Sequence, residues 1–521
     1  MWLSSGLLQA QTVELEKTHE LSKRAKRGYL YHVNQDTETG NVDLIFITSQ
    51  NSRRIKMEIY SFDKDYNLLD QRQEEQEIEN NRIKLRLGKS DVEIKVTYKE
   101  PFVRYGISVE RTLTGALVLK KKETTYTWST FFGEYTKSVK TLEKVKPKTD
   151  EGDKYLLVSH YEDDYTGDAI ILATPKNEMG YKRMTLMRFN KDLELVNKKD
   201  VDFNYAMNAF YKTVVTEPSP DDEAIELSKG AFIMLAPTRW GRKEIRAPKD
   251  KVNEFEILEF DNNFENIVRV PFKAATSLWR IDQTFQQGDK WYFYGLSADA
   301  KDKYHDQILN PNKFKSVQLM KYNSTENKVE YIANTSLGEM KAKIKTPPSQ
   351  KRKPVFKGNL FEKKVILIND RDELVLSGQN YKATKKGVVY QDVITLYFDN
   401  KGVLKAMYGV DPVENNKFAK SWGAPQYILD VGESKQNMYL ILTEIDGYDR
   451  GDNRFEYYPR IAKISKNDAS ISNFTTLGVV NKKKFYLDKK HPFFNPAPNK
   501  ITFFASTSNG KYIYFGRVKL D

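Results

Sequence analysis

The sequence predicts an all-β protein built from a repeated strand–turn–strand unit. Two observations carry this prediction: the aromatic content, and a hairpin pattern that recurs along the chain. The 521 residues include 31 Tyr and 28 Phe, and aromatic residues make up 12% of the chain. Tyr and Phe suit the half-buried, pleated surfaces of strands. So high an aromatic content excludes a disordered chain.

The recurring pattern is an alternating strand that ends on a large apolar residue, a polar turn rich in Asp, Asn and Lys, and a second strand. Asp and Asn side chains hydrogen-bond to nearby backbone and tolerate left-handed conformations, so they are suited to closing hairpins. Successive copies lie about 57 to 76 residues apart, enough for four strands plus insertions. The strand-ending residues are Phe62, Phe132 (a weaker copy), Phe189, Phe260, Tyr322, Phe398, Ile464 and Leu520.

Most copies are preceded by a short, continuously apolar run, which is the pattern of a strand covered on both faces. Examples are residues 44–47, 169–173 and 438–442. We therefore expect each unit to contain a buried inner strand, an alternating strand, a turn and an outer strand such as residues 266–271. This order is typical of a β-propeller blade, whose sheet buries its faces against neighbouring blades. A β-sandwich array is the alternative fold.

The two ends of the chain complete the predicted repeat. Residues 512–521 form an alternating strand that stops where an outer strand is expected to begin, and residues 13–17 have the pattern of such a strand. Without this partner the last sheet has an open edge, which invites aggregation. We therefore predict a β-propeller of about eight four-stranded blades, closed by the N-terminal strand in the C-terminal blade. Seven blades are expected if the weak copy at Phe132 is not a blade.

The predicted organisation is a single propeller domain over residues 11–521. Residues 1–10 are apolar and rich in small residues, with charges beginning at Glu14, so they have the character of a secretory signal peptide that lacks a basic n-region. Basic insertions near residues 242–251 and 341–357 interrupt the repeat and are predicted to be solvated loops. No apolar run of membrane-spanning length occurs, so no transmembrane segment is predicted.

The residue types exclude several kinds of chemistry. The chain has no cysteine, which excludes disulfides, a thiol nucleophile and cysteine-ligated metal. No nucleophile elbow, dinucleotide-binding loop or Walker motif is present. We therefore predict no catalytic residue, no cofactor and no metal site. Five histidines, none in a ligand-spaced pair, lie far apart in the sequence: His19, His32, His160, His305 and His491.

Two acidic clusters are alternatives to that expectation, because several carboxylates on one loop are the ligands that calcium prefers. Neither matches an EF-hand, and solvated turn caps explain both equally well. The first holds Glu162, Asp163, Asp164 and Asp168, and the second holds Asp446, Asp449 and Asp452.

The net charge of +13 favours acidic partners. Basic and acidic residues alternate and no RNA-binding aromatic motif occurs, so nucleic acid is not a predicted partner. A protein partner is expected instead, docked on the basic segment 341–357. The candidate docking residues are Lys341, Lys343, Lys345, Lys351, Arg352, Lys353 and Lys357.

The chain resembles exported β-propellers of Bacteroidota in its signal-like start, its lack of cysteine, its Lys-, Asn- and Tyr-rich composition and its blade motif. In size, compartment and character, although not in any motif, it is similar to the plug-like periplasmic subunit of the type 9 protein-export translocon. The resemblance implies a non-enzymatic module, periplasmic or outer-membrane-associated, that docks on an outer-membrane protein-export complex. The alternative is a glycan-binding or glycan-active propeller. Its sugar-contacting residues would be Trp240, Trp279, Trp291 and Trp422, whose other expected role is packing between blades.

We expect the mature protein to lack residues 1–10, because signal peptides are removed on export. N-terminal sequencing, or the intact mass of the protein isolated from its native cells, checks this. Recovery of Met1 in a cytoplasmic fraction would contradict export.

Overall fold

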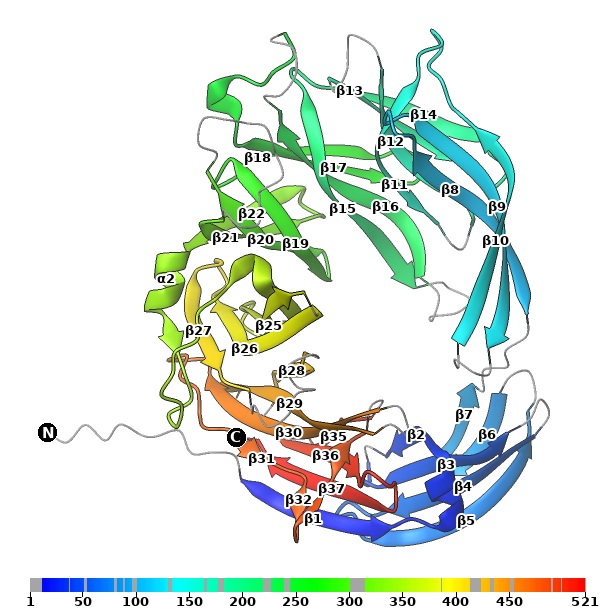
Figure 1. Cartoon of the computed structure of the whole chain (residues 1–521), viewed down its shortest axis with the longest axis vertical. Coiled ribbons are helices and arrows are strands. Elements are labelled where there is room, and N and C mark those ends of the chain that lie inside the picture. Colours follow the sequence, from blue (N-terminus) through cyan, green and yellow to red (C-terminus); the bar gives the residue numbers. More distant parts are fainter. Residues whose placement is uncertain are drawn as a thin grey trace, which may run out of the picture. The chain divides into compact units, whose positions relative to one another are not determined.

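The chain divides into two compact units, Met1–Tyr98 with Leu337–Asp521 and Lys99–Ser336, and each is described by itself (Figure 1). The structure, a computed structural model, describes residues 12–36, 38–50, 54–78, 82–87, 90–95, 101–129, 134–163, 166–176, 182–218, 226–238, 244–299, 314–385, 387–412, 423–431, 435–449, 454–488, 491–497 and 499–520.

The unit Lys99–Ser336 consists of one three-stranded and three four-stranded antiparallel sheets, with strands paired in chain order. The three-stranded sheet holds β8 (Phe102–Arg111), β9 (Leu117–Ser129) and β10 (Glu134–Val145). The four-stranded sheets are β11 (Tyr155–Glu162), β12 (Ala169–Pro175), β13 (Arg183–Phe189) and β14 (Leu195–Asp202); β15 (Met207–Pro218), β16 (Glu226–Pro237), β17 (Glu254–Asp261) and β18 (Ile267–Lys273); and β19 (Leu278–Gln287), β20 (Lys290–Ala298), β21 (Ser316–Asn323) and β22 (Lys328–Ser336). A short 3-10 helix, η1 (Lys249–Lys251), precedes β17.

The other unit repeats this organisation. Its sheets are β2 (Tyr29–Gln35), β3 (Val42–Gln50), β4 (Arg54–Phe62) and β5 (Leu68–Glu77); β23 (Ile344–Lys345), β24 (Phe361–Ile368), β25 (Leu374–Thr384), β26 (Gly387–Phe398) and β27 (Leu404–Val410); and β28 (Gln426–Leu429), β29 (Asn437–Asp449), β30 (Arg454–Ser465) and β31 (Thr475–Thr476). The last sheet combines β34 (Tyr486–Leu487), β35 (Phe493–Ala497), β36 (Lys500–Ser506) and β37 (Tyr512–Lys519) with β1 (Val13–Glu20). The remaining elements are the hairpins β6 (Arg82–Leu87) with β7 (Ser90–Lys95) and β32 (Val479–Val480) with β33 (Lys483–Lys484), and the helices α1 (Lys23–Arg27), α2 (Leu337–Ala342) and η3 (Gly358–Leu360).

This succession of antiparallel sheets confirms the all-β propeller fold. Over the described residues, seven sheets have four or five strands. The segment of the weak copy instead holds the hairpin β6–β7 and the three-stranded sheet β8–β10, and Phe132 itself lies outside the described residues.

The predicted equivalence of the repeat residues is confirmed. Phe62, Phe189, Phe260, Tyr322 and Phe398 each occupy the last or second-last position of the third strand of a sheet and pair with a residue of the second strand. All five are at most 5% exposed. Ile464 is the second-last residue of β30, and Leu520 directly follows β37. Both are buried as well.

The turn that follows these residues is also repeated in detail. Its first residue caps the turn: the Oδ1 atom of Asp63 accepts from the backbone N–H groups of Asp65 and Asn67, both at 2.8 Å. Its fourth residue is left-handed, with φ of 57° at Tyr66 and 67° at Leu193. Such values cost free energy in residues other than glycine. The Tyr66 side chain, which is fully buried and stacks on a neighbouring Phe ring, offsets that cost.

The strand order differs from the prediction in one respect. The apolar runs form the second strand of each sheet, and a half-buried strand such as β2 precedes them. The predicted unit begins at the apolar run directly before the alternating strand, so it leaves out the strand upstream of that run, even where this strand has apolar residues of its own, as β11 and β24 do. The third strands are covered on both faces, and every residue of β21 is buried. The alternating pattern of these strands predicts one buried and one exposed face, whereas in the structure both faces are buried.

The segment 341–357 is not the solvated loop that its charge predicts. It begins in α2, and β23 then pairs in parallel with β27, adding a fifth strand to that sheet. Met340, Pro354 and Phe356 are buried and anchor the segment to the sheet. The described part of the other insertion is anchored too, since Ala247 is buried and its N–H donates to the Thr238 carbonyl at 2.8 Å.

The predicted pairing of the chain ends is present. β1 runs antiparallel to β37, from Val13 opposite Val518 to Glu20 opposite Tyr512. Side chains strengthen the pairing, since the Tyr514 hydroxyl donates to Glu16 Oε1 at 2.6 Å. β1 is therefore the outer strand of the last sheet. The predicted signal-like residues 1–10 lie outside the described residues.

Deletion of residues 12–20 is expected to lower the melting temperature sharply and to promote aggregation. The deletion removes a row of backbone hydrogen bonds, each worth about 0.5–1.5 kcal/mol, and opens the edge of β37. Calorimetry and light scattering measure both effects, with deletion of residues 1–11, which spares β1, as the control. Equal melting temperatures for the two deletion variants would show that β1 does not stabilise the sheet.

Candidate functional site

The cations of segment 341–357 fall into two groups. Four of them bind groups of the chain itself: Lys343 Nζ donates to the Leu404 carbonyl at 2.5 Å and Lys345 Nζ to the Asp468 carbonyl at 2.6 Å. Lys357 donates to the side chain of Gln391. Arg352 pairs with Asp392 and Asp411. These four side chains are therefore largely committed to holding the segment on its sheet.

The other three cations, Lys341, Lys351 and Lys353, are exposed. Within the part of the chain that the structure describes, none of the three forms an ion pair. They are the part of the predicted docking segment that is available to a partner.

The acidic clusters act mainly inside the fold. Glu162 Oε1 accepts from the backbone N–H of Val109 at 2.8 Å, and Asp168 pairs with Arg188 at 2.6 Å. Asp446 pairs with Lys484 at 2.7 Å. Asp164 and Asp452 lie outside the described residues. Among the described ones, no three His, Asp or Glu side chains are grouped so that they would hold a metal ion.

The tryptophans proposed for sugar binding are packing residues where they are described. Trp279 and Trp291 are buried in the core shared by the sheets β15–β18 and β19–β22. Trp240 and Trp422 lie outside the described residues. The observed environment of Trp279 and Trp291 is therefore the inter-blade one.

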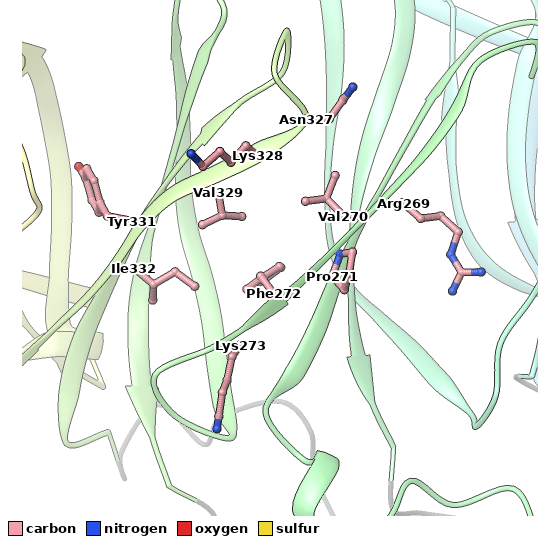
Figure 2. A pocket seen from close by; sticks show the side chains of 10 residues that line it. All are labelled: Arg269, Val270, Pro271, Phe272, Lys273, Asn327, Lys328, Val329, Tyr331 and Ile332. Atoms are coloured by element: carbon pink, nitrogen blue, oxygen red, sulfur yellow. The ribbon is translucent and has the colours of Figure 1, made fainter.

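A groove that the sequence analysis missed lies between the outer strands β18 and β22 (Figure 2). Its volume is about 580 Å³. The residues that line it are Arg269, Val270, Pro271, Phe272, Lys273, Asn327, Lys328, Val329, Tyr331 and Ile332.

The floor of this groove is apolar. Val270 and Phe272 from β18 meet Val329 and Ile332 from β22, and all four pack on the core that joins the two sheets. Figure 2 shows these four side chains between the two strands. The alternation of Val268, Val270 and Phe272 along a predicted outer strand was the available signal. Nothing in the sequence shows that β22 lies beside it.

The edges and rim of the groove are polar. β18 pairs with β17 and β22 with β21, and among the described strands neither has a second partner. Three cations and no carboxylate line the groove. Arg269 is bound to Glu256, with N–O distances of 2.5 and 3.0 Å. Lys273 and Lys328 are exposed and form no ion pair within the described residues.

Comparisons with known proteins give no family for this chain. No protein-family model matches it. No curated protein matches it either. Among solved structures, a variant of the Synechocystis apocarotenoid oxygenase is 7% identical, with a TM-score of 0.25 over 90% of this chain and 94% of the other.

Two further solved structures have a similar identity and TM-score. A GH43 β-1,3-galactosidase is 8% identical, with a TM-score of 0.25 over 78% of this chain and 86% of the other. An exo-β-1,3-galactanase from Clostridium thermocellum is 8% identical, with a TM-score of 0.26 over 85% and 93%. At these scores nothing is transferred from the three proteins to this chain.

No helix within the described residues has both the length and the apolar character required to cross a membrane.

Stability is expected to fall as the pH is lowered from about 6.5 to about 4, in part through His160. Burial, together with the positive charges of Lys212 and Arg111, lowers the pKa of His160 from 6.5 to about 4. Over this range the unfolded chain binds a proton that the folded chain excludes, so acidification favours unfolding. Melting temperatures at pH 4.5 and 7.5 test this. The variant His160→Gln should lose less stability on acidification than the parent, and an equal loss would contradict the assignment.

Proposed function

We propose that the chain is a non-enzymatic interaction module, exported to the periplasm, that docks on an outer-membrane protein-export complex. The observation that carries the proposal is the groove between β18 and β22. Within the described residues it combines an apolar floor, two strand edges without a second partner and lysines without an ion pair at its rim. This combination suits an extended segment of a protein partner, which adds to a strand edge through its backbone and places alternate side chains on the apolar floor.

Strand addition at an outer edge is a geometry that this fold already uses. β23 lies along the outer edge of β27, with Ile344 opposite Met407 and Lys345 opposite Tyr408. β1 lies along the edge of β37 and runs antiparallel to it, whereas β23 runs parallel to β27. In both cases a segment distant in sequence completes a sheet. β18 and β22 offer the same kind of edge to another chain.

The charge of the groove specifies the partner segment further. Lys273 and Lys328 project from the two walls without a carboxylate partner among the described residues, whereas Arg269 is already neutralised by Glu256. An acidic segment with apolar residues at alternate positions therefore fits best. Exposed cations raise the rate of association with an acidic partner more than they raise its affinity. The signal-like residues 1–10 support the export part of the proposal.

The double variant Lys273→Glu/Lys328→Glu is expected to lose most of its recovery of outer-membrane partners. Both side chains are exposed, so the fold is retained while the groove becomes acidic and repels the partner segment. The measurement is quantitative mass spectrometry of proteins co-purified with the tagged chain from native membranes. The matched control is Lys351→Glu/Lys353→Glu, which reverses two exposed charges on the docking segment predicted from the sequence.

The two variants separate the possible outcomes. Loss of partners with the groove variant alone supports the groove. Loss with the control alone assigns docking to segment 341–357 instead. A parent chain that purifies without any stoichiometric outer-membrane partner contradicts the proposed function.

A further inference from the structure

A second pocket lies on the three-stranded sheet β8–β10. The register places Phe102 and Arg104 of β8, Lys122 and Tyr126 of β9, and Lys137 of β10 on one face of this sheet. Within the described residues, Arg104, Lys122 and Lys137 form no ion pair, whereas Lys120 on the same face pairs with Glu110 at 2.6 Å. A small cavity of about 190 Å³ opens against them.

The Arg104 guanidinium lies against two aromatic rings. Phe102 and Tyr126 stack with centroids 4.5 Å apart, and the Arg104 guanidinium carbon lies 5.2 Å and 5.8 Å from the two centroids. Lys137 Nζ lies 5.2 Å from the Tyr126 centroid. Contact with aromatic rings stabilises the positive charge of a guanidinium but does not use its N–H donors. These donors lie in one plane and can bind a carboxylate through two parallel hydrogen bonds.

The opposite wall of the cavity is acidic. It is formed by Glu162 and Asp163 at the end of β11, and by Gly167 in the turn that follows. The turn sits directly on β8: Gly167 has φ of +77°, and a Cβ atom there would lie 2.9 Å from the Tyr105 carbonyl oxygen. Glu162 accepts one backbone hydrogen bond, from Val109. A carboxylate has about four acceptor sites, so Glu162 can accept further hydrogen bonds from a ligand.

Cations on one wall and carboxylates on the other restrict the ligand class. A plain polyanion such as polyphosphate has no donors for Glu162 and is repelled by it. A neutral sugar leaves the Arg104 donors without an anion. A ligand that carries a carboxylate and several hydroxyl donors satisfies both walls. The volume is below the roughly 300–1,000 Å³ of sites for drug-sized molecules, so it accommodates a single small unit.

We propose that this pocket binds one uronate unit of an acidic polysaccharide. The carboxylate pairs with Arg104, supported by Lys122 and Lys137, and hydroxyl groups donate to Glu162. This site is separate from the groove between β18 and β22 and does not depend on the function proposed for that groove.

Isothermal titration of the full chain with trigalacturonate tests the proposal. Cellotriose is the neutral probe and tripolyphosphate the anionic probe without hydroxyl groups. We expect binding of trigalacturonate only. Arg104→Gln should weaken this binding about tenfold or more, because a charge-assisted bidentate contact is lost. Glu162→Gln should weaken it as well, while its side-chain oxygen still accepts from Val109 and keeps the fold.

Two variants of the same sheet give the matched control. Lys137→Gln removes a charge from the pocket face and should weaken binding, whereas Lys140→Gln removes one from the opposite face and should not. Unchanged melting temperatures show that all variants are folded. Equal binding of tripolyphosphate, with a gain in affinity for Glu162→Gln, would reduce the site to a non-specific anion patch and overturn the proposal. Equal binding of cellotriose, or no binding of trigalacturonate, would also overturn it.

Discussion

The structure depends on one constraint: the middle strands of the four-stranded sheets must be covered on both faces. In such sheets of both units the second and third strands are buried on both sides, so a single sheet cannot be stable alone. The cores reflect this. One core joins β11–β14 to β15–β18, the next joins β15–β18 to β19–β22, and another joins β24–β27 to β28–β31. The outer strands β18 and β22 are left to carry the exposed charged residues of the groove, whereas the pocket takes its charged residues from the three-stranded sheet β8–β10 and from the end of β11.

The turn between the third and fourth strands has a second role in this packing. Besides capping its own hairpin, it is contacted by a basic side chain of another sheet. Lys121 binds Asp192 at 2.5 Å, Arg371 binds Asn467 at 3.0 Å and Arg517 binds Asp65 at 3.3 Å. The polar turn residues that define the repeat in the sequence therefore also align neighbouring sheets. This explains why the turn keeps its form even where a large residue such as Leu193 must be left-handed.

The fold could be predicted from the sequence because its strongest signals are local. The residues from Phe62 to Phe398 that end the third strands, their Asx turns and the apolar second strands are all defined within about ten residues. The half-buried first strands lie upstream of this local unit and were therefore not predicted. The two-residue strand β23 also has no recognisable pattern, because it lies in a lysine-rich segment. Lys343 and Lys345 were therefore predicted to be solvated, whereas in the structure they donate hydrogen bonds to backbone carbonyls.

Both candidate sites were beyond prediction for a different reason. The groove needs β18 beside β22, and the β8–β10 pocket needs the turn at Gly167 against β8. These are contacts between sheets, and no pattern within a strand encodes them. Two walls were visible in part. The outer strand at residues 266–271 has alternating apolar residues, and Glu162 and Asp163 belong to an acidic cluster for which calcium was the predicted ligand.

The pairing of β1 with β37 has a consequence for how the chain acquires its structure. β1 is synthesised well before its partner, because about 500 residues separate the two strands in the sequence. At about 5–20 residues per second the two are separated by roughly 25–100 s of synthesis. During that time the Val13–Glu20 strand has no native neighbour, while contacts of such large sequence separation form slowly in any case. The sheet that contains β1 and β37 can therefore be completed only after β37 has been synthesised, and until then β1 must be kept from pairing with other strands.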